Sequence, residues 1–449
     1  MNLSRRLCLR RALSGALVVA GALAAFPLSA DATTIERIVS PGGIMAWLVQ
    51  EPSVPLIALD FAFKGGATQD PPDRAGVATM TAALLDEGAG DIESKDFHER
   101  VESKAIEISF TATRDYVSGS LRTLTENQDE AFDLLRLAVT APRFDAVDVE
   151  RIREQTLSGL RRATTSPNEL ASQRWWATAF KGHPYAQPPR GTLESVPAIT
   201  VDDLKNFVRK TFALDTLKVA IVGNIDAATA GKLIDRIFGG LPAKGALSPV
   251  ANASPQGLGQ RIAIDLDVPQ SVLMIGGAGI LRKDPDFMAA FVLNHVLGGS
   301  AFSSRLYKEV REARGLAYSV YSAVMPLDHA SLFVSGTATR TDRTDQALEV
   351  MRAEIRKLAE TGPTEDELAK AKSFLTGSFA LRFDTSTKIA QQLVQIQLDE
   401  LGIDYIDKRN SLVDAVTMAD VKRVAKRLLD ANMLVTVVGK PQPLPAKGG

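Results

Sequence analysis

The sequence predicts an α+β fold of two similar, duplicated domains, each a mostly antiparallel sheet covered by helices on one face. Three observations lead to this prediction. Sequence blocks recur at a nearly constant offset, predicted strands and helices follow one another in an order typical of α+β domains, and a glycine- and proline-rich segment separates the copies. The 449 residues are 45% hydrophobic and 23% charged, which provides enough apolar material for more than one core.

The repeat consists of blocks that occur in the same order in both halves. These blocks are AITVDDLK at 198–205, LKVAIVG at 217–223, AVTMADVK at 415–422 and LVTVVG at 434–439. Within them, Thr200 and Thr417 lie 217 residues apart. A further pair, Gln173 and Gln391, lies 218 residues apart. A common offset over several blocks indicates a duplicated domain of roughly 200 residues.

Alternating apolar residues predict strands, and apolar residues at helical spacing predict helices. The predicted strands include residues 44–49, 56–63, 115–121 and 217–222. The predicted helices include residues 76–87, 148–162, 201–210, 344–360 and 364–381. Strands followed by helices and a final strand favour α+β domains over a parallel α/β sheet.

Composition divides the chain into five predicted parts. These are a signal peptide at 1–32, a first domain at 33–240, a linker at 241–260, a second domain at 261–440 and a tail at 441–449. The linker is rich in glycine, proline, alanine and serine, as expected for a connection rather than a core element.

The first 32 residues have the pattern of a secretory leader. An arginine-rich start precedes an apolar run at 12–28, and small residues follow, with Ala30 and Ala32 as candidate cleavage sites. The apolar run is shorter than the roughly 20 residues of a membrane span, so we expect no stable membrane anchor. Arg5 and Arg6 also resemble a twin-arginine signal, which leaves Sec-type and twin-arginine export open. We expect a soluble protein in the periplasm or another exported location.

Several classes of function are disfavoured by composition. Cys8, in the predicted leader, is the only cysteine, so the mature chain offers no thiol nucleophile and no disulfide. Lys+Arg at 52 balance Asp+Glu at 53 without a basic cluster, so no nucleic-acid partner is expected. The four histidines are far apart and are interpreted as structural, and no serine-hydrolase elbow, phosphate loop or dinucleotide fingerprint occurs.

Three motif blocks carry a family resemblance over essentially the whole mature chain. They are FKGGATQD at 63–70 followed by GVA at 76–78, GHPY at 182–185 followed by GT at 191–192, and LGGSAFSSRLY at 297–307 followed by REARGLAYSVY at 311–321. In these blocks the chain resembles the insulinase/pitrilysin-like zinc metallopeptidases, the inverzincins. Its length is similar to that of the processing-peptidase-like branch, whose members are built from two half-subunits.

The resemblance also implies that the zinc motif is vacant. Active members carry His-x-x-Glu-His on a helix and a distant Glu, which together bind zinc and activate water. The corresponding positions here are Thr79, Ala82, Ala83 and Gly159. We therefore expect no metal or other cofactor in this chain, and expect zinc in a partner subunit.

A second implied site lies in the second half, where family members use an Arg and a Tyr seven residues apart on the substrate backbone and the developing oxyanion. Arg311 and Tyr318 are the matching positions, with Arg311 also binding substrate. The alternative pair with the same spacing is Arg314 and Tyr321. From the residues alone, a solvated arginine on a helix face and a packed tyrosine would account for the first pair.

The sequence leaves three functions open. The first is a subunit that is inactive alone but donates Arg311 and Tyr318 to peptide hydrolysis at the zinc site of a sister subunit, in an exported heterodimer or larger metallopeptidase complex. The second is a non-catalytic peptide-binding or scaffold protein of the same fold. The third is a self-sufficient hydrolase with a site that the motifs do not reveal.

Overall fold

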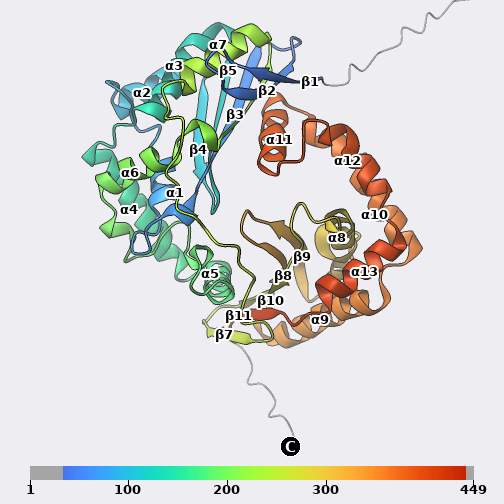
Figure 1. Cartoon of the computed structure of the whole chain (residues 1–449). Helices are drawn as coiled ribbons and strands as arrows, with labels where there is room; N and C mark the ends of the chain where they lie inside the picture. Colours follow the sequence, from blue (N-terminus) through green and yellow to red (C-terminus); the bar gives the residue numbers. More distant parts are fainter. Residues whose placement is uncertain (1–33, 441–449) are drawn as a thin grey trace, which may run out of the picture. The chain divides into compact units, whose positions relative to one another are not determined.

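Two sheets form the frame of the molecule, which the computed structural model describes from residue 34 to residue 440 (Figure 1). The predicted signal peptide and tail lie outside these residues. The first sheet has the spatial order β1 (Ile35–Val39), β2 (Met45–Gln50), β6 (Leu217–Gly223), β3 (Leu56–Lys64), β5 (Tyr116–Leu124) and β4 (Glu107–Ala112). The second has the order β7 (Arg261–Asp265), β11 (Leu434–Gly439), β8 (Gln270–Ala278), β10 (Ser331–Arg340) and β9 (Ala317–Pro326).

The two sheets have the same topology. The order β2-β6-β3-β5-β4 in the first sheet is repeated as β7-β11-β8-β10-β9 in the second. In both, the last strand of the half pairs parallel with one neighbour and antiparallel with the other, and the remaining pairs are antiparallel. The predicted fold class, two duplicated α+β domains with mostly antiparallel sheets, is confirmed.

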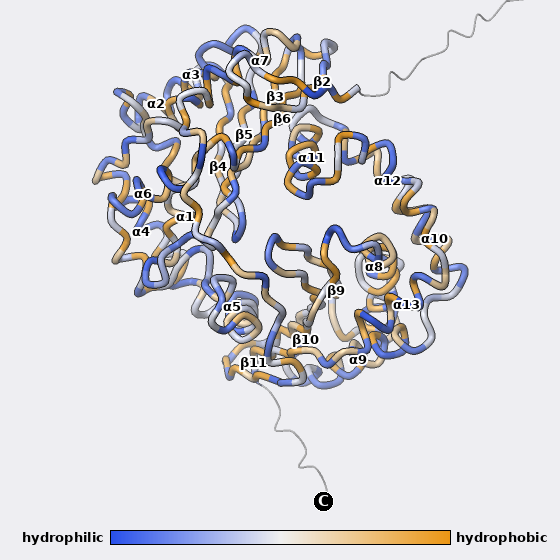
Figure 2. The backbone as a smooth tube through the Cα atoms, in the orientation of Figure 1, coloured by the Kyte–Doolittle hydropathy of each residue, from blue (hydrophilic) through white to orange (hydrophobic). Residues whose placement is uncertain are grey.

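Most helices of each half cover one face of its own sheet, and α5 and α11 are the exceptions described below. The first half contributes α1 (Val77–Ala82), α2 (Ser94–Ser103), α3 (Gln128–Thr140), α4 (Ala146–Ala163), α5 (Pro167–Ala179), α6 (Val201–Thr211) and α7 (Ala227–Phe238). The second contributes α8 (Phe287–Asn294), α9 (Thr344–Thr361), α10 (Glu365–Gly377), α11 (Ser386–Leu398), α12 (Tyr405–Asp414) and α13 (Met418–Leu429). Helix α8 is apolar along almost its whole length and lies within the second core (Figure 2).

The recurring threonines begin equivalent helices. Thr200 caps α6 and Thr417 caps α13, and in each case the hydroxyl accepts from the backbone N–H three residues on, at 3.2 Å. The aspartate at that third position, Asp203 or Asp420, accepts in return from the threonine N–H. Such a capping box satisfies the free amides of the first helical turn. The sequence repeat therefore marks a local signal for starting a helix.

Helices α5 and α11 are exchanged between the halves. Helix α5 contacts β8 and β11 of the second sheet, and α11 contacts β3 and β6 of the first (Figure 1). The buried indole of Trp175 donates to the Leu434 carbonyl at 3.3 Å, and the Gln397 amide donates to the Val219 carbonyl at 2.9 Å. Each sheet therefore has its own helices on one face and one helix from the other half on the opposite face.

Two predicted helices end earlier than expected. The helix predicted at 76–87 ends at Ala82, because the chain then turns to bury Leu84 and Leu85, and Gly88 adopts a φ of +90°. The helix predicted at 364–381 ends at Gly377, and a separate 3-10 turn follows at Phe379–Phe383.

Residues 241–260 contain no helix or strand and run along both halves. Ser248 exchanges two hydrogen bonds with Gln69, at 2.8 and 3.1 Å, and the Ala253 amide donates to the His329 carbonyl at 2.8 Å. The domain boundaries drawn from composition stay a prediction. Among the helices of residues 34–440, none combines the length and the apolar character that a membrane span requires.

Limited proteolysis should cut within 241–260 before it cuts either domain, because exposed segments without secondary structure are cut first. The two fragments should nevertheless elute together in native gel filtration, because α5 and α11 each remain packed on the other fragment. Trp175→Ala should weaken this association, since removing a buried tryptophan costs about 3–5 kcal/mol. The exposed Val147→Ala serves as the control. First cleavage within 300–320, or fragments that separate at once, would contradict this prediction.

Candidate functional site

Arg311 and Tyr318 come from two neighbouring elements of the second domain. Arg311 lies in a π-helical turn at Tyr307–Glu312, and Tyr318 lies near the start of β9, the outer strand of its sheet. Gly315 connects them with a φ of +57°, which glycine adopts without strain, and its amide donates to the Arg311 carbonyl at 2.9 Å. The chain therefore folds back at once and brings the two side chains together.

A β-bulge sets the direction of Tyr318. Val320 pairs with Thr337 of β10, whereas Ala317 pairs with Thr339, so the strand has one extra residue at this point. A bulge bends an edge strand and redirects a side chain. The Tyr318 side chain is accordingly 82% exposed, the most exposed of the large side chains on this strand.

The Arg311 guanidinium lies between two aromatic rings. It is 4.5 Å from the centre of the Tyr318 ring and 4.9 Å from that of the buried Tyr307 ring. Such cation–π contacts hold an arginine in place without using its N–H donors. Within residues 34–440, no carboxylate pairs with Arg311, and no hydrogen bond engages the Tyr318 hydroxyl. The pair therefore presents donors that are positioned and unused.

The alternative pair is not brought together. Arg314 forms an ion pair with Glu309 and also donates to the Glu309 carbonyl at 2.9 Å. Tyr321 lies over Gly336 of β10, so close that a Cβ at this glycine would be 2.9 Å from the tyrosine hydroxyl oxygen. Burial raises the pKa of Tyr321. No contact links Arg314 with Tyr321 in the described part of the chain.

A partly buried ion pair anchors the segment that precedes Arg311. The Arg305 side chain, 11% exposed, donates twice to Glu367 at 2.8 and 2.7 Å. Burial alone would raise the pKa of Glu367, but the hydrogen bonds from Arg305 and from the Thr364 amide lower it to about 2. The same carboxylate completes the capping box of α10. Residues 297–307 are thus tied to the start of α10.

The four vacant positions do not fit a zinc ion. Thr79 is within α1, where its hydroxyl donates to the Pro189 carbonyl at 2.7 Å. Ala82 is buried, Ala83 is the C-terminal cap of this helix, and Gly159 is within α4, which contacts α1. The helical frame is therefore kept, but these residues offer neither an imidazole nor a carboxylate.

The described histidines have local partners, and His183 and His329 lie on the same tyrosine, Tyr185. His98 contacts Glu87 at 3.2 Å, His183 contacts the Tyr185 amide and the Ala251 carbonyl, and His295 stacks on Phe374. Burial lowers the pKa of His295. No group of three His, Cys, Asp or Glu side chains able to hold a metal occurs between residues 34 and 440.

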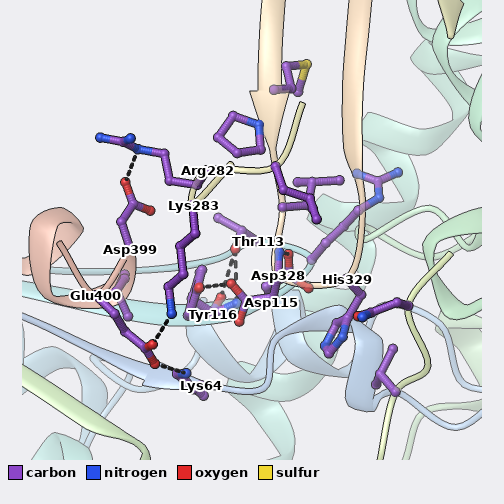
Figure 3. A pocket seen from close by; sticks show the side chains of 18 of the residues that line it. Lys64, Thr113, Asp115, Tyr116, Arg282, Lys283, Asp328, His329, Asp399 and Glu400 are labelled. Carbon is purple, nitrogen blue, oxygen red and sulfur yellow. Dashed lines mark hydrogen bonds and ion pairs between the residues drawn. The ribbon is translucent and has the colours of Figure 1, made fainter. Parts of the chain in front are cut away.

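A charged cavity of about 760 Å³ is lined by residues of both halves (Figure 3). Arg282 pairs with Asp399 at 3.1 Å, Lys64 with Glu400 at 3.7 Å, and the Tyr116 hydroxyl donates to Asp328. The Lys64–Glu400 and Tyr116–Asp328 contacts join the first half to the second, and the Arg282–Asp399 pair lies within the second half. Because the labelled charges largely neutralise one another, we interpret the cavity as a structural junction between the halves.

Tyr307 was not singled out by the motif comparison. It precedes Arg311 by four residues, and residues four apart share one face of a helix. This spacing is the signal that could have placed Tyr307 beside Arg311. The bulge at Tyr318 depends on pairing with β10 and has no such local signal.

The fold and the four vacant positions define a class of protein, a two-domain peptidase-like chain with no metal ligand at Thr79, Ala82, Ala83 or Gly159. Comparison with known families is consistent with this class. Residues 47–193 match the insulinase model of peptidase family M16, and residues 198–375 match the model of the peptidase M16 inactive domain. The chain belongs to the insulinase family, M16.

Individual relatives include proteins with and without a peptidase name. An uncharacterized zinc protease of Streptomyces coelicolor is 27% identical over 418 residues, which is 90% of both chains. The non-peptidase homolog YmxG of Helicobacter pylori is 29% identical over 74% of this chain and 77% of its own length. A peptidase M16 inactive domain from Pseudomonas fluorescens has a TM-score of 0.85 and 28% identity, covering 91% of this chain and all of that one.

Glu367→Gln tests the anchor of the site while keeping the shape of the side chain. We expect a loss of about 1–3 kcal/mol in unfolding free energy at pH 7, because the charged hydrogen bonds with Arg305 are weakened. The folded-state pKa lies below the ordinary glutamate value of 4.5, so the contribution of this carboxylate is present above about pH 4.5 and fades towards pH 2. Denaturation curves at pH 7 and pH 3 measure it, with the exposed Glu365→Gln as the control. An equal loss at both pH values would contradict the assignment.

Proposed function

We propose that this chain is the non-zinc partner subunit of an exported heteromeric metallopeptidase. A sister subunit of the same family would hold zinc, which polarises the scissile carbonyl and activates water. This chain would contribute Arg311 and Tyr318. The observation that carries the proposal is the unused Arg311–Tyr318 pair, placed on an outer strand and held by aromatic contacts rather than by carboxylates.

The chemistry of the two side chains suits peptide hydrolysis. Negative charge develops on the carbonyl oxygen as the tetrahedral intermediate forms, and a positioned hydroxyl donor stabilises it. Tyr318, 82% exposed, has this donor free among the described residues. The forked N–H groups of Arg311 can hold a neighbouring backbone carbonyl of the same peptide. A protein that needed only a packing surface would have no use for two such donors.

The second candidate is a non-catalytic peptide-binding or scaffold protein. It is favoured by the outer strands β4 and β9, each of which has an edge to which an extended peptide could add. The vacant positions in α1 and α4 agree with either candidate. The activity of the mixed complex separates them, since a scaffold does not depend on Tyr318.

Purified alone, the mature protein should bind no stoichiometric zinc and show no chelator-sensitive peptidase activity. The reason is the set Thr79, Ala82, Ala83 and Gly159, which lacks metal ligands. Elemental analysis and peptide-cleavage assays measure both properties. A variant of this chain with Thr79→His, Ala82→Glu, Ala83→His and Gly159→Glu restores the motif residues and should bind more zinc. One tightly held zinc per unmodified chain would overturn the expectation.

Tyr318→Phe should leave complex formation with a zinc-bearing sister intact and lower turnover by roughly 10²–10³, the effect of removing one oxyanion donor. Arg311→Ala should lower kcat and raise KM, because it weakens the binding of both the substrate and the transition state. Arg314→Ala and Tyr321→Phe are the matched controls and should change turnover little. Co-expression, gel filtration and peptide-cleavage rates provide the measurements. Undiminished turnover in both Tyr318→Phe and Arg311→Ala would favour the scaffold.

A further inference from the structure

A polar pocket of about 250 Å³ lies on the face of the first sheet that packs against α11. Helix α11 contacts β3 and β6, and the pocket forms beside it, over β5 and β4. Cross-strand pairing places Asp60 opposite Ser120 and Ser120 opposite Ser109, so these three side chains form one row of the floor. Ser118 and Thr111 form the next row.

The wall of the pocket comes from α11 and has two kinds of surface. Gln391 and Gln395, one helical turn apart, are exposed at its opening. Val394 and Leu398 are 3% and 8% exposed and line the interior. A ligand in this pocket therefore meets apolar side chains along its length and polar groups at its ends.

Asp60 is a buried carboxylate without a partner. It is only 8% exposed, and no hydrogen bond or ion pair joins it to another residue between 34 and 440. Burial of such a group costs free energy unless a donor compensates. Accordingly, burial raises the pKa of Asp60 to about 7. The carboxylate is the only charged side chain that lines the pocket.

The duplicated domain provides an internal comparison. Asp60 pairs with Ala220 in the first sheet, and at the equivalent position of the second sheet Met274 pairs with Thr436. Met274 is therefore the counterpart of Asp60. In the same way, Ser120 corresponds to Gly336, and Ser109 corresponds to Tyr321. The Tyr321 ring covers Gly336. The second domain thus fills the equivalent place with Met274 and the Tyr321 ring, and has no carboxylate there. The fold does not require a carboxylate there, so Asp60 has no structural role that the second domain repeats.

We propose that this pocket binds a primary ammonium group on an aliphatic stem, such as a lysine side chain of an extended peptide. The ammonium would pair with Asp60 and donate to the serine hydroxyls, while the methylene groups would lie along Val394 and Leu398. A Ca²⁺ or Mg²⁺ ion fits less well, because each takes about six or more oxygen ligands and Asp60 is the one carboxylate that lines the pocket. The proposal concerns the first domain and is independent of the proposed role of Arg311 and Tyr318.

The test measures binding of Nα-acetyl-lysine amide to the full mature chain at pH 8, where the carboxylate is ionised. The norleucine analogue has the same length of stem without the ammonium and should not bind. Asp60→Asn should weaken lysine binding at least about tenfold, the loss of one charge-assisted contact. Asp265→Asn, an exposed aspartate on a strand, is the matched control and should bind like the wild type. Titration calorimetry or NMR shifts give the affinities.

Two further measurements distinguish a loss of lysine binding from a loss of folding. Asp60→Asn should raise the thermal midpoint at pH 8, because an unpartnered buried charge is removed. Ser118→Leu keeps Asp60 but fills the pocket, and should also abolish lysine binding. No binding by the wild type, equal binding by Asp60→Asn, or equal binding of the norleucine analogue would overturn the proposal. None of these outcomes involves a sister subunit, so the proposed peptidase function would be unaffected.

Discussion

The exchange of α5 and α11 is the constraint on which the rest of the structure depends. Each sheet is apolar on both faces at its centre, and the helix from the other half covers most of the second face. Trp175 and Gln397 extend this packing with hydrogen bonds to β11 and β6. Without these helices, the inner face of each sheet would expose a large apolar surface to water. The two halves are therefore parts of one folding unit.

This constraint also determines where polar groups can occur. Helix α11 covers the centre of the first sheet, so β5 and β4 at its edge carry serine and threonine where the centre carries alanine and valine. In the second domain, Arg311 and Tyr318 likewise lie at an outer strand, away from the exchanged helix. Buried apolar packing and accessible polar side chains are thus separated within each sheet.

The sequence predicted the duplication and the sheets, because both depend on spacing along the chain. Arg311 and Tyr318 were named through the family resemblance, and their role in catalysis stays a prediction. The sequence did not predict the helix exchange, since helical periodicity identifies an apolar face but not the sheet that this face meets. The helix at 76–87 was predicted too long because the burial of Leu84 and Leu85 is a tertiary effect. Asp60 did leave a signal, as a single acidic residue in the apolar strand Leu56–Lys64. Its lack of a partner became visible only in three dimensions.

The reciprocal exchange of α5 and α11 has an evolutionary consequence. The two helices occupy equivalent places on equivalent sheets, so two identical one-domain chains could form the same arrangement as a twofold, domain-swapped homodimer. Fusion of the two genes would make the arrangement intramolecular. In a homodimer of identical chains every substitution is present in both copies, whereas in a fused chain each copy can change separately. A fused chain can hold Asp60 in one copy and Met274 at the matching place in the other, and can keep Arg311 and Tyr318 in one copy alone.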